Sequence, residues 1–373
     1  MNGQWVGQYN GSNQGTLVID LDDLGTQYAG RIYAYDNNLD LPFAVAYIAI
    51  PRGVTTFREK LRLSPIDPRT RNPGVWTDDV AKLFPGVTFP EMADVIMTWE
   101  GDAVSVEWKT DIGTSSRARI LRSRAAEPTE YVPLPDIRTW EQFKTYVNGL
   151  EHRRYIFRGQ KQRCRLRTTF HRTGRADLVR FVNEDIPTLH RHLSSRTNHI
   201  FNLTVPDQNG AFFNLVQHYG YPTPLLDWTY SPYVGVFFAY HHVKNSEAAT
   251  AGADDKVRVF LFDQKQWRHD RIQMTQLVGN HLHFSIMEFI ALNNERLIPQ
   301  QSISSVTNID DIESYIKTLE AGEKAYLSII DLPIGERPLI MRELSAMGIT
   351  AGSLFPGIEG ACTELKERMF PNL

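Results

Sequence analysis

The spacing of apolar residues in the first third of the chain is that of short β-strands. Up to residue 123, apolar or small side chains alternate with polar ones, which is the two-residue period of a half-buried strand. This period predicts strands at Gly3–Tyr9, Leu17–Leu21, Gln27–Ala34, Ala44–Ile50, Val95–Glu100 and Val104–Lys109. We therefore expect an all-β barrel or sandwich module over residues 1–123. Such a module is either a structural or partner-binding unit or a target-recognition domain that uses exposed aromatic side chains.

A cluster of prolines separates this region from a second pattern. Pro128, Pro133 and Pro135 predict a linker over residues 124–136. After it, Thr139 and Gln142 have the spacing of a capping box, which opens a helix. The apolar face of that helix consists of Trp140, Phe143, Val147 and Leu150, which we expect in a core.

Residues 137–373 mix helical and strand periods. Residues 176–200 have a helical pattern, whereas Val257–Phe262 and Ala325–Ile330 have the composition of buried strands. The predicted fold class is therefore α+β, with an N-terminal all-β module followed by a mixed α/β domain over residues 137–373.

The composition places the chain among compact, water-soluble proteins. A chain of 373 residues is longer than one hydrophobic core usually supports, and its 42% apolar residues are enough to form two cores. A formal net charge of -3 argues against a generally cationic coat, and two cysteines, Cys164 and Cys362, are too few for a disulfide scaffold. The first residues do not have the pattern of a secretory leader, and no apolar run is long enough to cross a bilayer. We expect a cytoplasmic protein with no membrane partner.

Several common catalytic motifs are absent from the sequence. It contains no Gly-rich phosphate loop, dinucleotide fingerprint, nucleophile elbow or HExxH helix. His281 and His283 can lie on one side of a strand, but no matching cysteine or carboxylate set accompanies them, so we expect no metal site.

Four blocks in the second half carry the most specific pattern. In Tyr155–Gln160, three apolar residues lead into Arg-Gly-Gln, as a buried strand delivers an arginine at its end. Gln217–Pro232 combines a turn with a short apolar strand and leads into an apolar helix over Tyr233–Tyr240. The other two blocks are Asn294–Gln301 and Gly348–Pro356.

In this order the blocks resemble the FRG domain, a family named for its Phe-Arg-Gly triplet, over about residues 137–370. The β module lies outside the resemblance. One departure is Ser302, which stands where the family usually has a glycine after the paired glutamines. Its φ angle therefore matters, because serine adopts a positive φ poorly.

The resemblance implies the architecture of the ADP-ribosyltransferase superfamily, whose substrate is NAD. Arg158-Gly159 then stands where that superfamily has Arg-Gly or His-Gly, and Trp228–Ser231 stands for its Ser-Thr-Ser block. Glu295 is the implied catalytic glutamate beside Arg158, with Gln301 as its rival. The residues implied to surround NAD are Arg158, Gly159, Gln160, His218, Tyr219, Asp227, Trp228, Thr229, Tyr230, Ser231 and Gln301.

These residue types suit cleavage of the bond between nicotinamide and ribose. Nicotinamide is a good leaving group, so positioning and electrostatics dominate the chemistry. The planar guanidinium of Arg158 suits a pyrophosphate, unless it is a structural arginine paired with Asp227. The carboxylate of Glu295 suits the positive charge that develops on the ribose, unless it is a solvated charge at a strand end. We expect one cleft to be lined by Arg158, Tyr219, Thr229 and Ser231.

A basic strip surrounds the Arg-Gly pair. Residues 151–180 contain ten lysines and arginines, from Arg153 to Arg180, against two acids, Glu151 and Asp177. Such a density attracts the phosphates of a dinucleotide or of RNA or DNA, unless distant acids balance it in space.

The resulting expectation is a transferase that moves ADP-ribose from NAD to a macromolecular acceptor, RNA, DNA or protein. The family association adds the role of a bacterial toxin or phage-defence effector with a neutralising protein partner. The alternatives are a non-catalytic module that binds a nucleotide or a partner, and an NAD glycohydrolase with water as the acceptor.

Overall fold

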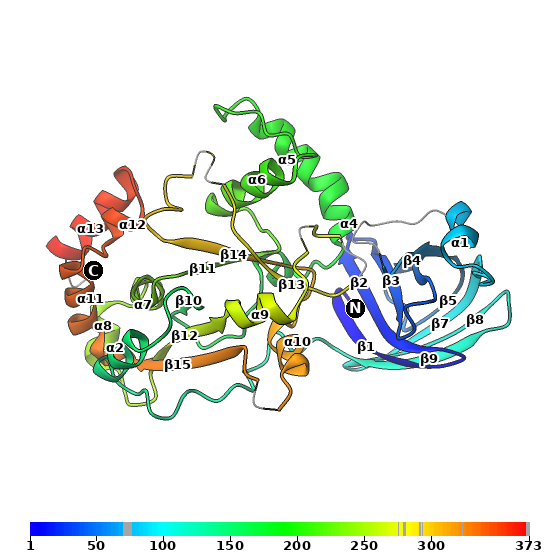
Figure 1. The fold of residues 1–373 in the computed structure, drawn as a ribbon, viewed down its shortest axis with the longest axis horizontal. Helices are drawn as coiled ribbons and strands as arrows, with labels where there is room; N and C mark the ends of the chain where they lie inside the picture. The colour runs from blue at the N-terminus through cyan, green and yellow to red at the C-terminus, as the bar shows by residue number, and fades with distance from the viewer. Residues whose placement is uncertain are drawn as a thin grey trace.

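The protein is an α+β molecule in which a barrel-like sheet lies beside a region of helices around a second sheet (Figure 1). The computed structural model describes residues 1–69, 77–274, 276–278, 281–290, 292, 294–322 and 324–370. In this part of the chain, every helix is too short or too polar to cross a membrane.

The N-terminal sheet is antiparallel and nearly closed, with the strand order β5-β7-β8-β9-β1-β2-β3-β4-β6. Its strands are β1 (Gly3–Gly11), β2 (Gln14–Asp23), β3 (Gln27–Asp36), β4 (Phe43–Pro51), β5 (Thr56–Arg62), β6 (Ser64–Ile66), β7 (Met92–Glu100), β8 (Ala103–Thr110) and β9 (Ser115–Leu121). Alternate residues fill the interior, as Leu17, Ile19 and Leu21 of β2 do. The six expected strands and the barrel-like module are confirmed.

Three strands and one helix of this module were not expected. The outward positions of β5 and β9 are occupied mostly by charged or hydroxyl side chains, so these strands have a weak apolar period. A short helix, α1 (Thr77–Leu83), interrupts the β pattern before β7.

The second sheet has the strand order β13-β14-β11-β10-β12-β15. Its strands are β10 (Tyr155–Gln160), β11 (Leu225–Thr229), β12 (Lys256–Asp263), β13 (Phe284–Met287), β14 (Ser302–Thr307) and β15 (Leu327–Pro333). All six residues of β10 pair with β12, whereas β10 and β11 pair at Phe157↔Thr229 alone. The two strands therefore diverge beyond this pair, and the sheet is split between them.

Helices cover both faces of this sheet. The helices and helical turns after the β module are α2 (Trp140–Asn148), α3 (Thr169–Arg172), α4 (Leu178–Arg180), a π-helical turn (Phe181–Asp185), α5 (Ile186–Leu193), α6 (Pro206–His218), α7 (Pro232–Tyr240), α8 (Asn245–Thr250), α9 (Gln264–Asp270), α10 (Ile312–Leu319), a 3-10 turn (Ile334–Glu336), α11 (Arg337–Ala346), α12 (Ala351–Leu354) and α13 (Ile358–Met369). The helical pattern of residues 176–200 thus forms α4, the π-helical turn and α5.

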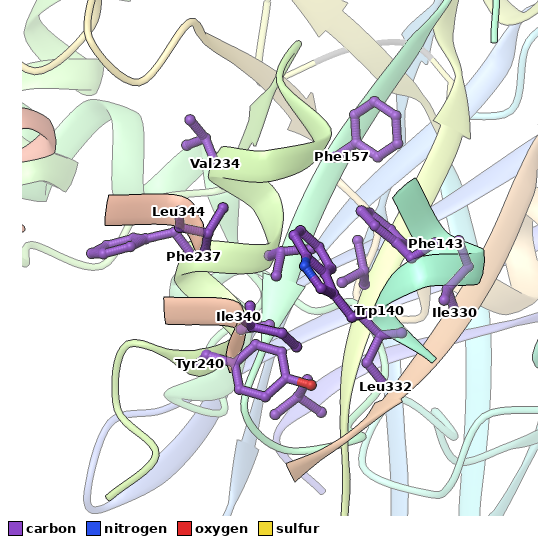
Figure 2. Packing of buried hydrophobic residues seen from close by; sticks show 14 of the residues in the cluster. Trp140, Phe143, Phe157, Val234, Phe237, Tyr240, Ile330, Leu332, Ile340 and Leu344 are labelled. Carbon is purple, nitrogen blue, oxygen red and sulfur yellow. The ribbon is translucent and has the colours of Figure 1, made fainter. Parts of the chain in front are cut away.

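One face of the sheet packs against α2, α7 and α11 (Figure 2). Trp140 and Phe143 of α2 are buried there against Phe237 of α7 and Leu332 of β15. The expected capping box at Thr139 and Gln142 is present. On the other face, Ile156, Phe260 and Ile329 pack with α9 and α10. Because successive strand residues point to opposite faces, a sheet covered on both sides has continuous apolar runs.

The segment between the two sheets packs against the second domain. Leu134 donates its backbone N–H to the carbonyl oxygen of Ile329 (3.0 Å), and the Tyr131 hydroxyl donates to Glu320 (3.1 Å). The prolines therefore end the β pattern without producing a detached linker.

Candidate functional site

A cleft of about 550 Å³ opens where β10 and β11 diverge. It is lined by β10 and the loop after it, the ends of α3 and α6, β11, α7, the segment that leads into β14, and the residue after α12. The lining residues used below are Arg158, Gly159, Gln160, Lys161, Cys164, Arg172, Gln217, His218, Asp227, Trp228, Thr229, Arg296, Gln300, Ser302 and Phe355.

Glycines in the two blocks allow the floor of the cleft to form. Helix α7 lies against β10, and a Cβ placed on Gly235 would stand 3.0 Å from the Cβ of Phe157. A side chain on Gly235 would therefore be tighter than ordinary packing, so Phe157 or α7 would have to shift by a few tenths of an ångström. Gly159, the glycine of the Phe-Arg-Gly triplet, also lies against α7. Close packing of β10 on α7 therefore explains why both positions are glycine.

Arg158 crosses the gap between the two strands. Its Nη1 donates to the backbone carbonyl oxygen of Asp227 at 2.6 Å, so it bonds the main chain of β11 rather than the Asp227 carboxylate. Its Nε is buried and has no hydrogen-bond partner in the described structure. Burial lowers the pKa of Arg158, nearby Arg172 lowers it further, and Asp227 opposes both effects. Arg158 therefore bridges β10 and β11, and its buried Nε is left without an acceptor in the described structure.

A second unused donor comes from the next outward position of the same strand. The Nε2 of Gln160 is buried without a hydrogen-bond partner in the described part of the chain. A buried donor without an acceptor costs about 1–3 kcal/mol. Two such donors, on Arg158 and Gln160, are matched by a ligand that presents oxygen acceptors.

The cleft is cationic. Lys161 pairs with Glu247 (2.7 Å), and Arg296 pairs with Glu359 (3.1 Å) while its guanidinium lies 4.9 Å from the centre of the Phe355 ring. In the described structure, the side chains of Arg158 and Arg172 have no carboxylate partner within ion-pair distance. Two neighbouring arginines left unpaired in one cleft favour an anion between them.

Asp227 is the one carboxylate among the described lining residues. Gln217 donates from Nε2 to Asp227 Oδ1 and accepts at Oε1 from the hydroxyl of Thr223. Gln217 is thereby held at both ends of its amide, which fixes the orientation of the Asp227 carboxylate. His218 follows Gln217 in the chain, and burial and Arg296 lower the pKa of its imidazole, which favours the neutral form.

The structure brings together seven of the residues that the sequence singled out. They are Arg158, Gly159, Gln160, His218, Asp227, Trp228 and Thr229. The indole of Trp228 itself is buried and donates to Ser305 Oγ at 3.0 Å, so it serves the core. The Thr229 hydroxyl donates to the carbonyl oxygen of Gln300 (2.7 Å), which ties β11 to the segment before β14.

Glu295 does not line the cleft. It lies in an exposed turn ahead of β14, and its neighbour Arg296 is the residue that reaches the cleft. The expectation that Glu295 stands at a strand end beside Arg158 is wrong, because the strand begins only at Ser302.

Gln301 also lies outside the cleft lining, for a backbone reason. It is exposed and has a φ of 47°, so it makes the left-handed turn into β14. Ser302 is an ordinary first strand residue that lines the cleft. The departure from the family pattern at Ser302 therefore places no strain there, since the positive φ falls one residue earlier.

Three further candidates point elsewhere. Tyr219 is 78% exposed and borders a separate cavity of about 700 Å³ between α5 and α6. Tyr230 donates its hydroxyl to Glu288 (2.6 Å), with Arg153 stacked on its ring. Ser231 is buried as the N-cap of α7, where its hydroxyl accepts from the N–H of Val234. The expected cleft of Arg158, Tyr219, Thr229 and Ser231 is thus wrong for Tyr219 and Ser231.

Several lining residues were not among the sequence candidates. Arg296, Gln300 and Phe355 belong to blocks that carried the family resemblance, and Gln217 opens the second of these blocks. Their position in these blocks was the one feature of the sequence that could have identified them as site residues. Arg172 was visible only as one of ten basic residues.

The basic strip is largely neutralised by distant acids. Seven of its ten cations form ion pairs, namely Arg154 with Asp263, Lys161 with Glu247, Arg163 with Asp331, Arg165 with Asp311, Arg167 with Asp310, Arg175 with Asp22 and Arg180 with Glu184. Arg165 is even buried, at 2% exposed. Acids elsewhere in the fold therefore balance these seven residues. Two of the remaining three cations, Arg158 and Arg172, line the cleft.

His281 and His283 serve packing roles. His281 lies against Tyr35 and Phe43 of the β module, and His283 is buried with its Nδ1 3.1 Å from Ser285 Oγ. Burial lowers the pKa of His283 to about 4. A search of the described residues finds no set of three His, Cys, Asp or Glu side chains placed to hold a metal ion.

Comparison with known proteins gives one match. No curated protein and no solved structure is similar to the chain. Residues 153–248 match the FRG domain family, and this segment contains the Phe-Arg-Gly triplet, the free Arg172, Asp227 and the Gly235 helix. The match thus supports the FRG family for this chain, at the residues that build most of the cleft.

Proposed function

We propose that the cleft binds NAD and that the protein is an NAD-dependent ADP-ribosyltransferase with a macromolecular acceptor. One observation carries the proposal: Arg158 and Arg172 line the same cleft between β10 and β11, and neither has a carboxylate partner among the residues that the structure describes. Such a pair suits the two charges of a pyrophosphate, because guanidinium groups donate bidentate hydrogen bonds to phosphate oxygens.

The other features of the cleft support a dinucleotide as the ligand. The cavity volume lies within the range of small-molecule sites. The unpartnered Nε2 of Gln160 suits a ribose or amide oxygen, and Phe355 adds an aromatic side chain to the lining, against which a base can pack. The architecture expected from the family resemblance, with Arg158-Gly159 on one strand and Thr229 at the end of another, agrees with this arrangement.

In this proposal Asp227 takes the role that the sequence gave to Glu295. As the bond between nicotinamide and the ribose C1′ breaks, nicotinamide leaves as a neutral base and positive charge develops on the ribose. The Asp227 carboxylate, oriented by Gln217, stabilises that charge. The acceptor nucleophile then bonds to C1′, and its proton passes to Asp227 or to water.

The observation that favours a second candidate is the position of Glu295 outside the cleft. A module that binds the nucleotide without turnover needs only the cationic cleft. The two functions are separated by incubating the protein with labelled NAD and a cell lysate. Transfer of label to RNA, DNA or protein supports the transferase, free ADP-ribose supports a glycohydrolase, and binding without either product supports the binding module.

A further inference from the structure

Arg172, which like Arg158 has no carboxylate partner in the described structure, is the last residue of α3. Contacts from the two parts of the molecule hold that helix. At its start the second domain fixes it, because the Phe170 N–H donates to the Thr223 carbonyl oxygen (3.1 Å) and the Thr223 N–H donates to Thr169 Oγ1 (3.0 Å). The loop that follows Arg172 has different partners.

The N-terminal β module holds that loop. The Asp22 carboxylate at the end of β2 accepts the N–H groups of Ala176 (2.8 Å) and Asp177 (3.1 Å) and the Nε of Arg175 (2.8 Å). Asp22 is 1% exposed, so the three bonds satisfy a carboxylate that is removed from water.

Neighbouring strands of the module add to this grip. Arg31 of β3 donates to Asp177 Oδ1 at 2.7 Å, and Asp177 in turn caps α4. At the other end of the loop, Asn2 Nδ2 donates to the carbonyl oxygen of Gly174 (3.1 Å), whose φ of 82° makes the sharp turn. The four residues after Thr173 are thus bonded to β1, β2 and β3 of the module or the residues beside them.

The loop that leads into α3 is linked to the same module through Asp310. Arg167 pairs with Asp310 (3.1 Å between Nη2 and Oδ2), and the Asp310 N–H donates to Oε1 of Gln4 at 2.8 Å. Gln4 lies on β1 and is buried. Arg172 therefore belongs to a short helix that the module holds directly on its C-terminal side and, through Asp310, indirectly on its N-terminal side.

We propose that the N-terminal β module is a positioning element of the cleft, in which Asp22 fixes the loop 174–177 and thereby holds Arg172 beside Arg158. The inference rests on the proposed function only for the identity of the anion that the cleft binds. The placement of the Arg172 charge follows from the contacts alone. It assigns the β module a role in ligand binding although the cleft residues lie in the second domain.

The test measures the charge of the cleft without using NAD. Cys164 is an exposed thiol that lines the cleft with Arg172. In a Cys362→Ser background, its reaction rate is measured with a dianionic aromatic disulfide reagent and with an uncharged one. The ratio of the two rates reports the local potential, because nearby cations attract the dianion.

We expect Arg172→Gln to lower this ratio by about threefold or more. Asp22→Ala should lower it too, although removal of a negative charge would by itself raise it. The double variant should fall no lower than Arg172→Gln alone, because Asp22 acts through Arg172.

The matched control is Asp23→Ala, which removes the same charge from the next residue of β2, where Asp23 pairs with Arg52 at the surface. Its ratio should stay at or slightly above that of the parent. Should Asp22→Ala fail to fold, Arg31→Gln loosens the same loop through Asp177 and should give the same direction. An unchanged ratio in a folded Asp22→Ala or Arg31→Gln protein, or additive losses in the double variant, overturns the positioning role.

The result also separates this inference from the proposed function. If NAD does not bind but the rate ratios behave as stated, the positioning role stands and the ligand is a different anion. If NAD binds with equal affinity to the parent and to Asp22→Ala, the cleft binds NAD as proposed, and the positioning role of Asp22 is wrong.

Discussion

Gly159 and Gly235 meet backbone to backbone, so that a Cβ added to Gly159 would stand 1.9 Å from the Gly235 carbonyl oxygen and 2.5 Å from the Ala239 nitrogen. Main-chain atoms of a buried helix cannot move aside as a flexible side chain can. The contact sets the distance between β10 and α7 and thereby the depth of the cleft.

We expect Gly159→Ala to destabilise the fold by about 3 kcal/mol, the upper part of the range for an overpacked core. The measurement is the free energy of unfolding in denaturant. Gly149→Ala is the matched control, because the nearest atom to its added Cβ is 3.5 Å away and its φ of -85° suits alanine. Equal stability of the two variants would show that α7 shifts freely on the strand.

Arg158→Ala should weaken NAD binding by about 2 kcal/mol, the usual loss for a charge-assisted hydrogen bond. Isothermal titration calorimetry measures this difference. Arg163→Ala removes an arginine of the same basic strip that pairs with Asp331 and lies outside the cleft lining, so it should leave the affinity unchanged. A similar loss in both variants would point to general electrostatic attraction.

Asp227→Asn should lower the single-turnover rate of nicotinamide release by about a hundredfold, with little change in NAD affinity, because its charge matters most as the glycosidic bond breaks. Glu295→Gln should release nicotinamide at the wild-type rate, since Glu295 lies in an exposed turn outside the cleft lining. The reverse outcome would mean that the turn before β14 closes onto bound NAD. Full activity in both variants would show that neither carboxylate takes part in the cleavage of NAD.

Stability should fall in acid partly because of His171, which is buried beside Thr168 with 2.7 Å between Nδ1 and Oγ1. Burial lowers its pKa from the ordinary 6.5 to about 4. Between these pH values the unfolded chain takes up a proton that the folded chain excludes, so this contribution to stability falls as pH falls through the window and levels off below it.

The expected loss from His171 is about 3 kcal/mol between pH 7 and pH 4. It is measured as the difference in pH dependence of the unfolding free energy between the wild type and His171→Gln, which has no titrating group at that position. The variant should have the shallower dependence. Parallel curves would show that His171 is protonated in the folded protein.

The fold could be predicted wherever one face of an element is apolar. The alternation in β2 and the continuous apolar run in β12 each matched a strand, and Thr139 with Gln142 marked the start of α2. The sequence did not indicate β5, where burial reaches only two of seven positions. The local sequence pattern does not predict a strand that is stabilised mainly by hydrogen bonds to its neighbour, as β5 is by β7.

The candidate site could be predicted as far as local motifs reach. Arg158 and Asp227 each follow the apolar run of a recognisable strand, and both line the cleft. Glu295 was placed by analogy with a strand end, but the left-handed turn at Gln301 delays the strand. Arg172 could not be distinguished from its neighbours, because only the fold shows which cations of the strip pair with an acid and which do not.

The single pairing between β10 and β11 gives the second sheet an edge in its middle. Strand edges are normally hazards, because their free main-chain groups recruit strands from other molecules and promote aggregation. Here the edge faces a walled cleft, bordered by the end of α6 and by Phe355, that admits a small molecule. The walls of the cleft can thus shield this edge from intermolecular β-pairing while leaving it open to a ligand. Amide hydrogen exchange along residues 158–160 should accordingly slow when the cleft is filled.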